Sequence, residues 1–320
     1  MTSLYAVTMI GLLTSRSRAR LAAVSFVCLL TFASPLRAQV RGLYTPGMSA
    51  TNSGELPEAG LTYVAAVQAY SFDELKGAAG DQLPVNLTAS VFFAQNLFVW
   101  VSDFKILGGT YAASANLPIA NASLTSVRFG ALQGGSGLSD SDYSPLTLGW
   151  QWSRADIQAS YGFVVPTGRF QAGASDNTGG GYWAHIPNAG QTVYLTADKT
   201  TAVSAYEMYE FHGTQKHTDI RPGQTFNIDY SFTQMLPLTP DKGTLLQIGL
   251  VGYGQYQTTD HRGVTAIAAG THYTVNALGI AAGVTVPERQ IEVGVKYLKE
   301  FANEATVQGH SLQITAAVTF

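Results

Sequence analysis

Polar and charged side chains stand at every second position along several segments of the chain. Residues 156 to 160 alternate Asp156, Gln158 and Ser160 with Ile157 and Ala159. In an extended strand these positions share one face, so they would line a common surface that offers a solute hydrogen bonds and a mildly acidic wall. The alternative is that they only fill and wet an interior. The candidate lining residues are Asp156, Gln158, Ser160, Asn227, Asp229, Gln247, Tyr253, Gln255, Glu292, Lys296 and Glu300.

A second group of candidates lies in one long loop. Pro166 ends a strand pattern, and three consecutive glycines, residues 179–181, allow backbone conformations that other residues avoid. Such a loop could fold inward and gate a ligand. The alternative is a surface loop with Tyr182 and Trp183 as interfacial anchors. The gate candidates are Pro166, Gly168, Arg169, Asn177, Gly180, Tyr182 and Trp183.

Catalytic groups are poorly represented. His310 stands next to Ser311, but adjacent residues of a strand point to opposite faces, so they cannot form a nucleophile and base pair. The six histidines are scattered, and no HExxH, CxxC or phosphate-binding loop occurs. Residues 134–138 (GGSGL) lack a strand–turn–helix context and are predicted to be loop. We therefore predict no enzyme activity, no cofactor and no metal.

The elements that position these residues are strands. Residues 225–233 (TFNIDYSFT) place aromatic and aliphatic side chains on one face and polar side chains on the other. The same alternation recurs along the chain in segments of about 10 residues or more, the length needed to cross a bilayer at a tilt. The predicted strands lie near residues 60–70, 88–102, 107–123, 144–153, 155–165, 182–197, 200–212, 223–235, 243–258, 272–286, 289–302 and 308–320.

The connections favour a membrane barrel over a soluble sandwich. Tight joins at 154, 198–199 and 287–288 alternate with long polar connections at 124–143, 166–181, 213–222 and 259–271. Short turns on one side and long loops on the other are typical of outer-membrane barrels. The predicted fold is all-β: a closed antiparallel transmembrane β-barrel of about 12 strands, with short periplasmic turns and long extracellular loops. The first two strands have the weakest pattern, so ten or fourteen strands remain open.

Composition excludes other classes. The chain has 320 residues, of which 46% are hydrophobic and only 12% charged, which is unlike a disordered protein. Its net charge of −3 and pI near 6.0 argue against nucleic acid as a partner. After the N-terminus no run of about 18 apolar residues occurs, which excludes a helical membrane bundle.

The N-terminus is predicted to be a signal peptide, residues 1–38. Three arginines precede the apolar run 21–33, and cleavage is expected after Ala38. Cleavage would remove the only cysteine, Cys28, and four arginines, shifting the net charge from −3 to −7. A signal anchor and a start at Met9 are the alternatives. We expect residues 39–59 to form a periplasmic lead-in and residues 60–320 to form the barrel, in the outer membrane of a Gram-negative bacterium after Sec export.

The last residue, Phe320, follows a strand with apolar residues at every second position. A terminal aromatic residue in this setting resembles the insertion signal of outer-membrane barrels. The outer-membrane insertion machinery is therefore an expected partner, beside the lipid itself.

Several blocks of the chain resemble the outer-membrane family named for the phenol meta-degradation pathway (MetA-type), described as transporter-like. The resemblance spans roughly residues 60–320 and implies a β-barrel that admits aromatic or other hydrophobic compounds. It carries over no catalytic or binding residue. The blocks are GTYAASANLPIA (109–120), YSPLTLGW (143–150), YGFVVPTGRF (161–170), NTGGGYW (177–183), Tyr209-Glu210 and LVGYGQYQTTD (250–260).

Three functions follow from these observations. The leading one is a narrow or gated passive channel for small hydrophobic or aromatic compounds, because a barrel of about twelve strands is too small for a wide aqueous porin. The alternative is a structural or adhesion-type barrel with a plugged lumen and no transport. A barrel lipid hydrolase is the remote third. The identity of the solute, the direction of transport and the oligomeric state stay open.

Overall fold

The structure is a computed structural model that describes residues 41–84, 87–126, 130–241, 243–264 and 270–320. The predicted signal peptide and its cleavage site lie outside the described residues. The chain divides into two units, Met1–Gln39 and Val40–Phe320, and all described residues lie in the second. Its elements are β1 (Gly60–Leu75), β2 (Leu87–Ile106), β3 (Gly109–Asn116), β4 (Ile119–Ser126), β5 (Gly130–Leu138), β6 (Ser141–Gln151), β7 (Ala155–Val165), β8 (Ala184–Tyr194), β9 (Thr201–His212), β10 (Thr225–Pro237), β11 (Leu245–Gln257), β12 (Thr274–Val286), η1 (Pro287–Arg289), β13 (Ile291–Glu304) and β14 (Val307–Thr319).

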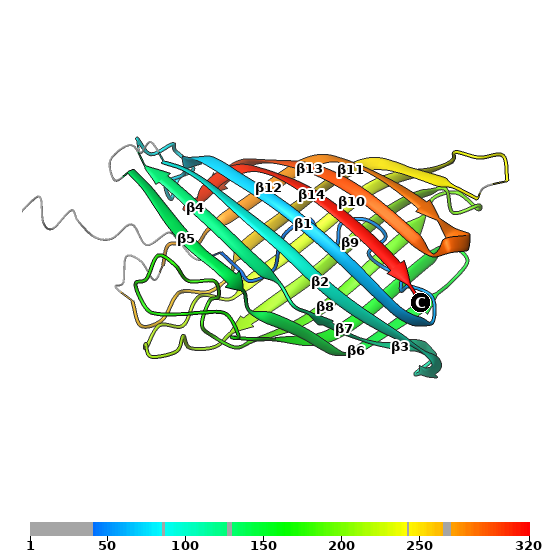
Figure 1. The fold of residues 1–320 in the computed structure, drawn as a ribbon, viewed down its shortest axis with the longest axis horizontal. Helices are drawn as coiled ribbons and strands as arrows, with labels where there is room; N and C mark the ends of the chain where they lie inside the picture. The colour runs from blue at the N-terminus through cyan, green and yellow to red at the C-terminus, as the bar shows by residue number, and fades with distance from the viewer. Residues whose placement is uncertain (1–40, 85–86, 127–129, 242, 265–269) are drawn as a thin grey trace, which may run out of the picture. The chain divides into compact units, whose positions relative to one another are not determined.

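The strands form one closed antiparallel ring (Figure 1). Each strand from β6 to β14 pairs with its neighbour in sequence, and β1 pairs with both β14 and β2, which closes the ring. β3 and β4 are two parts of one crossing, as are β5 and β6, so the structure is a 12-strand barrel. The predicted fold class is confirmed. No helix among the described residues is long and apolar enough to span a membrane.

One predicted loop is wrong. Residues 124–143 were expected to be a long connection, but β4 continues to Ser126 and β5 occupies Gly130–Leu138, including the GGSGL segment. The sequence shows no hydropathy alternation in β5, because its glycines contribute no side chain to either face. The crossings break at Pro118, which has no N–H to donate, and at Ser139, whose N–H donates to the Pro118 carbonyl oxygen at 2.8 Å.

The polar faces point inward and the apolar faces outward. On β10, Asn227 and Asp229 are almost inaccessible, whereas Phe232 on the opposite face is 47% exposed. Outward Ile280 is 62% exposed. An apolar exterior around a polar interior is the pattern of a barrel whose wall meets lipid.

The two ends of the barrel differ. At one end, called here the turn end, lie the short connections 152–154, 195–200, 238–244 and 287–290 and the C-terminus. The Phe320 N–H donates to the Leu61 carbonyl oxygen at 2.9 Å there, and the Phe320 side chain is 75% exposed. Trp150 and Trp152 also lie at this end. The other end, the loop end, carries the long connections 166–183 and 213–224.

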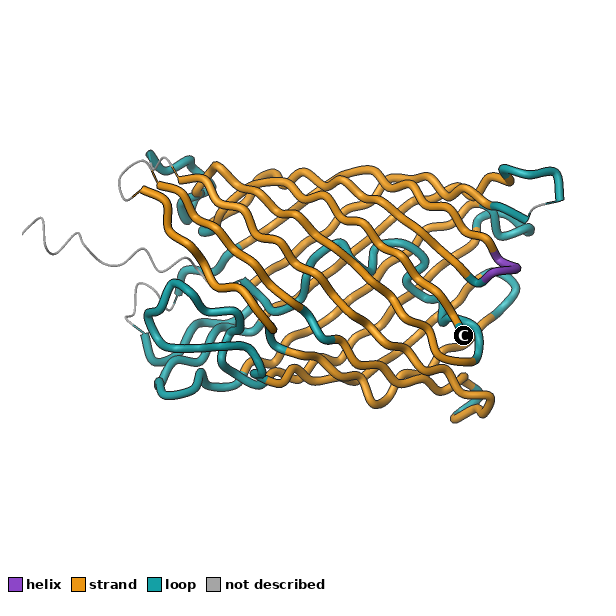
Figure 2. The backbone as a smooth tube through the Cα atoms, viewed as in Figure 1, coloured by secondary structure: helices purple, strands orange, loops and turns teal. Residues whose placement is uncertain are grey.

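A segment without regular structure, residues 41–59, passes through the interior from the loop end to the turn end. Figure 2 shows it as a loop inside the ring of strands. Its Tyr44 hydroxyl donates to inward Asp229, and its Glu55 accepts from Tyr194 near the turn end. The expected periplasmic lead-in is thus corrected to a segment within the lumen. An irregular segment has no hydropathy period from which its position could be predicted. Its hydrogen-bond partners also lie on strands far away in sequence.

Candidate functional site

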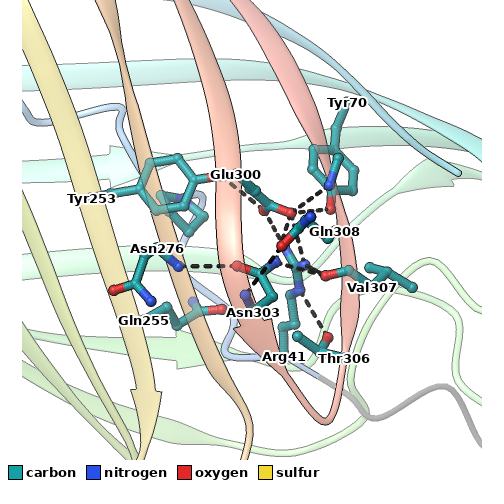
Figure 3. Close-up of polar contacts among 12 residues, drawn as sticks. Arg41, Tyr70, Tyr253, Gln255, Asn276, Glu300, Asn303, Thr306, Val307 and Gln308 are labelled. Carbon is teal, nitrogen blue, oxygen red and sulfur yellow. Dashed lines mark hydrogen bonds and ion pairs between the residues drawn. The ribbon is translucent and has the colours of Figure 1, made fainter. Parts of the chain in front are cut away.

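The interior segment, residues 41–59, is held at its loop end by an ion pair between the partly exposed Arg41 and the buried Glu300 (Figure 3). The Arg41 Nη1 lies 2.7 Å from Glu300 Oε1, and the Arg41 Nη2 donates to Glu300 Oε2 at 3.2 Å. The same guanidinium donates to the Val307 carbonyl oxygen at 2.6 Å and lies over the Tyr70 ring, 5.3 Å from its centroid. A planar guanidinium that meets a carboxylate with two hydrogen bonds has a fixed direction as well as a strong attraction.

Glu300 on β13 has more donors than this arginine alone. Its carboxylate accepts from the hydroxyls of Tyr70 at 2.8 Å and Tyr253 at 2.9 Å. It also accepts from the Asn303 side chain at 3.0 Å and the Gly309 N–H at 2.8 Å. Buried charge is tolerated only when it is paired and hydrogen-bonded, and Glu300 meets both conditions.

A second anchor lies deeper in the barrel, at Asp229 on β10 and Lys296 on β13. Asp229 accepts from the Tyr44 hydroxyl and from the N–H groups of Gly47 at 2.9 Å and Ser49 at 3.1 Å. Lys296 donates to the carbonyl oxygens of Gly47 at 2.9 Å and Met48 at 2.7 Å. Gly47 has φ +84°, a conformation that glycine adopts without strain. An acid on β10 and a base on β13, separated by two strands of the ring, thus hold one turn of the segment.

A third anchor lies near the turn end. Gln158 donates to the Ser53 carbonyl oxygen at 2.6 Å, and the Gly54 N–H donates to Thr192 Oγ1 at 3.0 Å. Gln247 donates to the Asn52 side chain at 2.8 Å. A Cβ on Gly54 would lie 1.9 Å from the Asp156 carbonyl oxygen, so only glycine allows this approach.

The segment also contacts β9 through residues that sequence reasoning missed. Glu210 accepts from the N–H groups of Leu43 at 2.6 Å and Tyr44 at 3.3 Å, and from Asn227 at 2.7 Å. The His212 Nε2 lies 2.9 Å from the Glu210 carboxylate. The inward position of Glu210 follows from the β9 alternation, but its aromatic and methionine neighbours on that face mask the polar pattern. Arg41 gave no signal, because nothing in its local sequence indicates a lumen.

The eleven predicted lining residues all lie at inward strand positions, and ten of them bond to the segment or to another residue of the wall. Five of them bond to the segment directly: Gln158, Asp229, Gln247, Lys296 and Glu300. The others bond within the wall: Asp156 with Tyr194, Ser160 with Thr147, Asn227 with Gln255, and Tyr253 with Glu300. Glu292 differs, since it is exposed near the turn end. These residues do not form one compact site.

The predicted gate loop, residues 166–183, is organised by Asp140, a residue outside the predicted set. The Asp140 carboxylate accepts from the N–H groups of Gly168 at 2.9 Å and Gly180 at 2.7 Å. Asn177 closes the tip by bonding to Gln171. One carboxylate thus holds both arms of the loop together.

Of the two aromatic gate candidates, one points inward and the other outward. Tyr182 is 1% exposed and packs with the His212 ring at 5.0 Å, in an apolar cluster that Leu43 and Tyr44 join. Trp183 is 53% exposed and packs on Phe163 at 6.1 Å. Tyr182 therefore meets the interior segment, whereas Trp183 faces outward as an interfacial anchor would. The remaining candidates stabilise the loop: the Pro166 carbonyl oxygen accepts from Lys216, and Arg169 pairs with Asp176 at 3.2 Å.

Beside the third anchor, Glu55 of the segment and Asp156 of the wall compete for one hydroxyl hydrogen. The Tyr194 hydroxyl lies 2.8 Å from Glu55 Oε1 and 2.6 Å from Asp156 Oδ2, and one hydroxyl hydrogen can serve only one of these oxygens. A proton on one carboxyl satisfies the second contact.

We expect this anchor to weaken as the pH rises, because loss of the shared proton leaves two carboxylates facing one hydroxyl hydrogen. The temperature of the heat-modifiable gel transition should be lower at about pH 8 than at about pH 5. The matched variant Glu55→Gln, which stays neutral, should lose this dependence. An unchanged pH profile in that variant would exclude Glu55 as the titrating group.

The described residues contain no group of three or more His, Cys, Asp or Glu side chains arranged to hold a metal ion. Ser311 is fully buried and points inward, whereas His310 is exposed outside, beside the Tyr297 ring at 6.0 Å. The two side chains therefore lie on opposite faces of β14, and the structure does not bring them together.

Comparison with known proteins places this geometry among outer-membrane barrels. The family described as "Putative MetA-pathway of phenol degradation" matches residues 72–316. The COG4313 outer membrane channel from Pseudomonas putida F1 is similar in structure, with a TM-score of 0.68 and 15% identity, over 87% of this chain and 100% of that one. The β domain of the Bordetella autotransporter BrkA has a TM-score of 0.50 and 10% identity, over 82% and 100% of the two chains. No curated protein matches the chain.

Proposed function

We propose that this chain, which belongs to the family of the putative MetA pathway of phenol degradation, is a gated passive channel of the outer membrane. Its solutes are small hydrophobic or aromatic compounds. The loop end faces the outside and the turn end faces the periplasm. Export and cleavage near Ala38 precede assembly, and the insertion machinery recognises the strand that ends at Phe320. No catalytic step is assigned.

One observation carries the proposal: the segment that fills the lumen is not part of the sheet. Among the described residues, no backbone-to-backbone hydrogen bond joins residues 41–59 to a strand. The segment is held by side chains such as Glu300, Asp229 and Gln158. It can therefore leave its place without breaking a strand pair, and the ring would remain closed while a path opened.

An apolar surface beside the segment supports the choice of solute. Tyr182, Ile186, Tyr206 and Met208 form a buried cluster against which Leu43 packs. Displacement of the segment would uncover this cluster near the loop end. Aromatic and thioether side chains suit an apolar or aromatic solute better than a sugar or an ion.

The filled lumen also favours a second candidate, a structural barrel that never opens. Uptake into vesicles separates the two. The vesicles should carry lipopolysaccharide in the outer leaflet, because plain phospholipid passes small aromatic compounds by itself. A channel should speed entry of a neutral aromatic probe over protein-free vesicles and should favour that probe over a sugar of similar size. Equal entry with and without protein would overturn the channel and favour the structural barrel.

A further inference from the structure

The outer wall carries a carboxyl group halfway up its apolar face. The outward residues of β9 are Val203, Ala205, Glu207, Tyr209 and Phe211. Val203 is 42% exposed and Phe211 is 46% exposed, and Glu207 lies midway between them. Ionisable groups at such a depth are costly in lipid and mark functional positions.

Glu207 has one partner in the wall. The Gln191 Nε2 on β8 donates to Glu207 Oε2 at 2.6 Å. That amide nitrogen has a second N–H, and the carboxyl has a second oxygen, Oε1. Neither has a partner among the described residues. Each copy of the chain therefore presents a spare donor and a spare acceptor to a medium without water.

Small outward side chains lie beside the polar pair on β7, β8 and β9. Ala189 lies opposite Glu207 in the β8–β9 register, Ala205 lies opposite Gln191, and Ala159 lies opposite Ala189 on β7. These small outward side chains leave the long side chains of Glu207 and Gln191 standing out from β8 and β9, with Ile157 on β7 and Ile228 on β10 flanking the pair. We call Ala159, Ala189, Gln191, Ala205 and Glu207 the β8–β9 patch.

We propose that the β8–β9 patch is the contact surface for a second copy of this chain, related by a two-fold axis along the membrane normal. Such an axis places β8 of one copy against β9 of the other, because rotation by half a turn exchanges the two sides of the patch. The spare N–H of Gln191 then donates to the spare oxygen of Glu207 in the partner, and the two-fold symmetry forms the same hydrogen bond a second time. Lipid acyl chains offer neither donor nor acceptor, so the hydrogen-bonding groups select a second copy. The inference goes beyond the proposed channel and needs only that the wall lies in a membrane.

Thiol cross-linking tests the proposal in a chain that also carries Cys28→Ser, so that the introduced thiol is the only one. Ala205→Cys reports on the patch, and Ala69→Cys, outward on β1 at the far side of the ring, is the matched control. In vesicles with excess lipid, a short thiol-to-thiol reagent should link the first variant into dimers and leave the second monomeric. Equal linking of both would show random collision and overturn the proposal.

Two further changes separate hydrogen bonding from folding. Added to Ala205→Cys, Glu207→Leu should lower the linked fraction about threefold to tenfold, the range for hydrogen bonds between membrane segments. Glu207→Gln keeps donors and acceptors and should link nearly as well as its parent. Because leucine suits lipid, Glu207→Leu should keep the heat-modifiable gel migration of a folded barrel. If that folded variant links as its parent does, the patch faces lipid or another protein and the proposal fails.

Discussion

Deletion of residues 41–57 should convert the barrel from a largely closed to an open state, with single-channel conductance rising on the order of tenfold. The reason is that the segment fills the lumen along its length, from Arg41 near the β13–β14 connection to Glu55 beside Tyr194. The strand ring does not depend on it for pairing. The inward carboxylates and Lys296 would then be hydrated by the water that enters.

Planar-bilayer recording of the deleted and full-length proteins provides the measurement, after both pass a test for heat-modifiable migration. A matched variant in which residues 41–57 become a Gly/Ser linker of equal length keeps the chain but loses its anchors. It should flicker between open and closed levels. Conductance that stays unchanged in the folded deletion variant would mean that the wall itself closes the path.

Glu300→Ala should destabilise the protein by about 3 to 5 kcal/mol, the usual cost of breaking a buried ion pair from one side. The substitution removes the partner of Arg41 and the acceptor for Tyr70, Tyr253, Asn303 and the Gly309 N–H. Arg41→Ala should cost less, because Glu300 keeps those other donors. Both variants should also open more often than wild type, since both release the loop end of the segment.

Glu292→Ala is the matched control for Glu300→Ala. Glu292 lies on the same strand and the same inward face, but it is exposed near the turn end. Its replacement should leave the temperature of the heat-modifiable transition close to that of wild type. A transition in Glu300→Ala that matches this control would show that the buried pair does not stabilise the folded barrel.

Much of the architecture could be predicted from local pattern. The period-2 alternation of residues 225–233 shows which side chains of β10 point inward, because successive strand side chains face opposite sides. Strand length and the alternation of short and long joins indicated a membrane barrel of about twelve strands. The exception, β5, is rich in glycine, which carries no hydropathy signal.

The sequence by itself determined the wall of this protein, and the tertiary structure decided what occupies the interior. The alternation that makes Asp229 an inward residue is local, spanning a few neighbours on one strand. Its bond to Gly47 joins residues 182 positions apart, and that of Arg41 to Glu300 joins residues 259 apart. Such contacts depend on ring closure, which brings β10 and β13 around one space. An irregular segment can enter that space because the wall offers it hydrogen bonds there, and no periodicity along residues 41–59 records that fact.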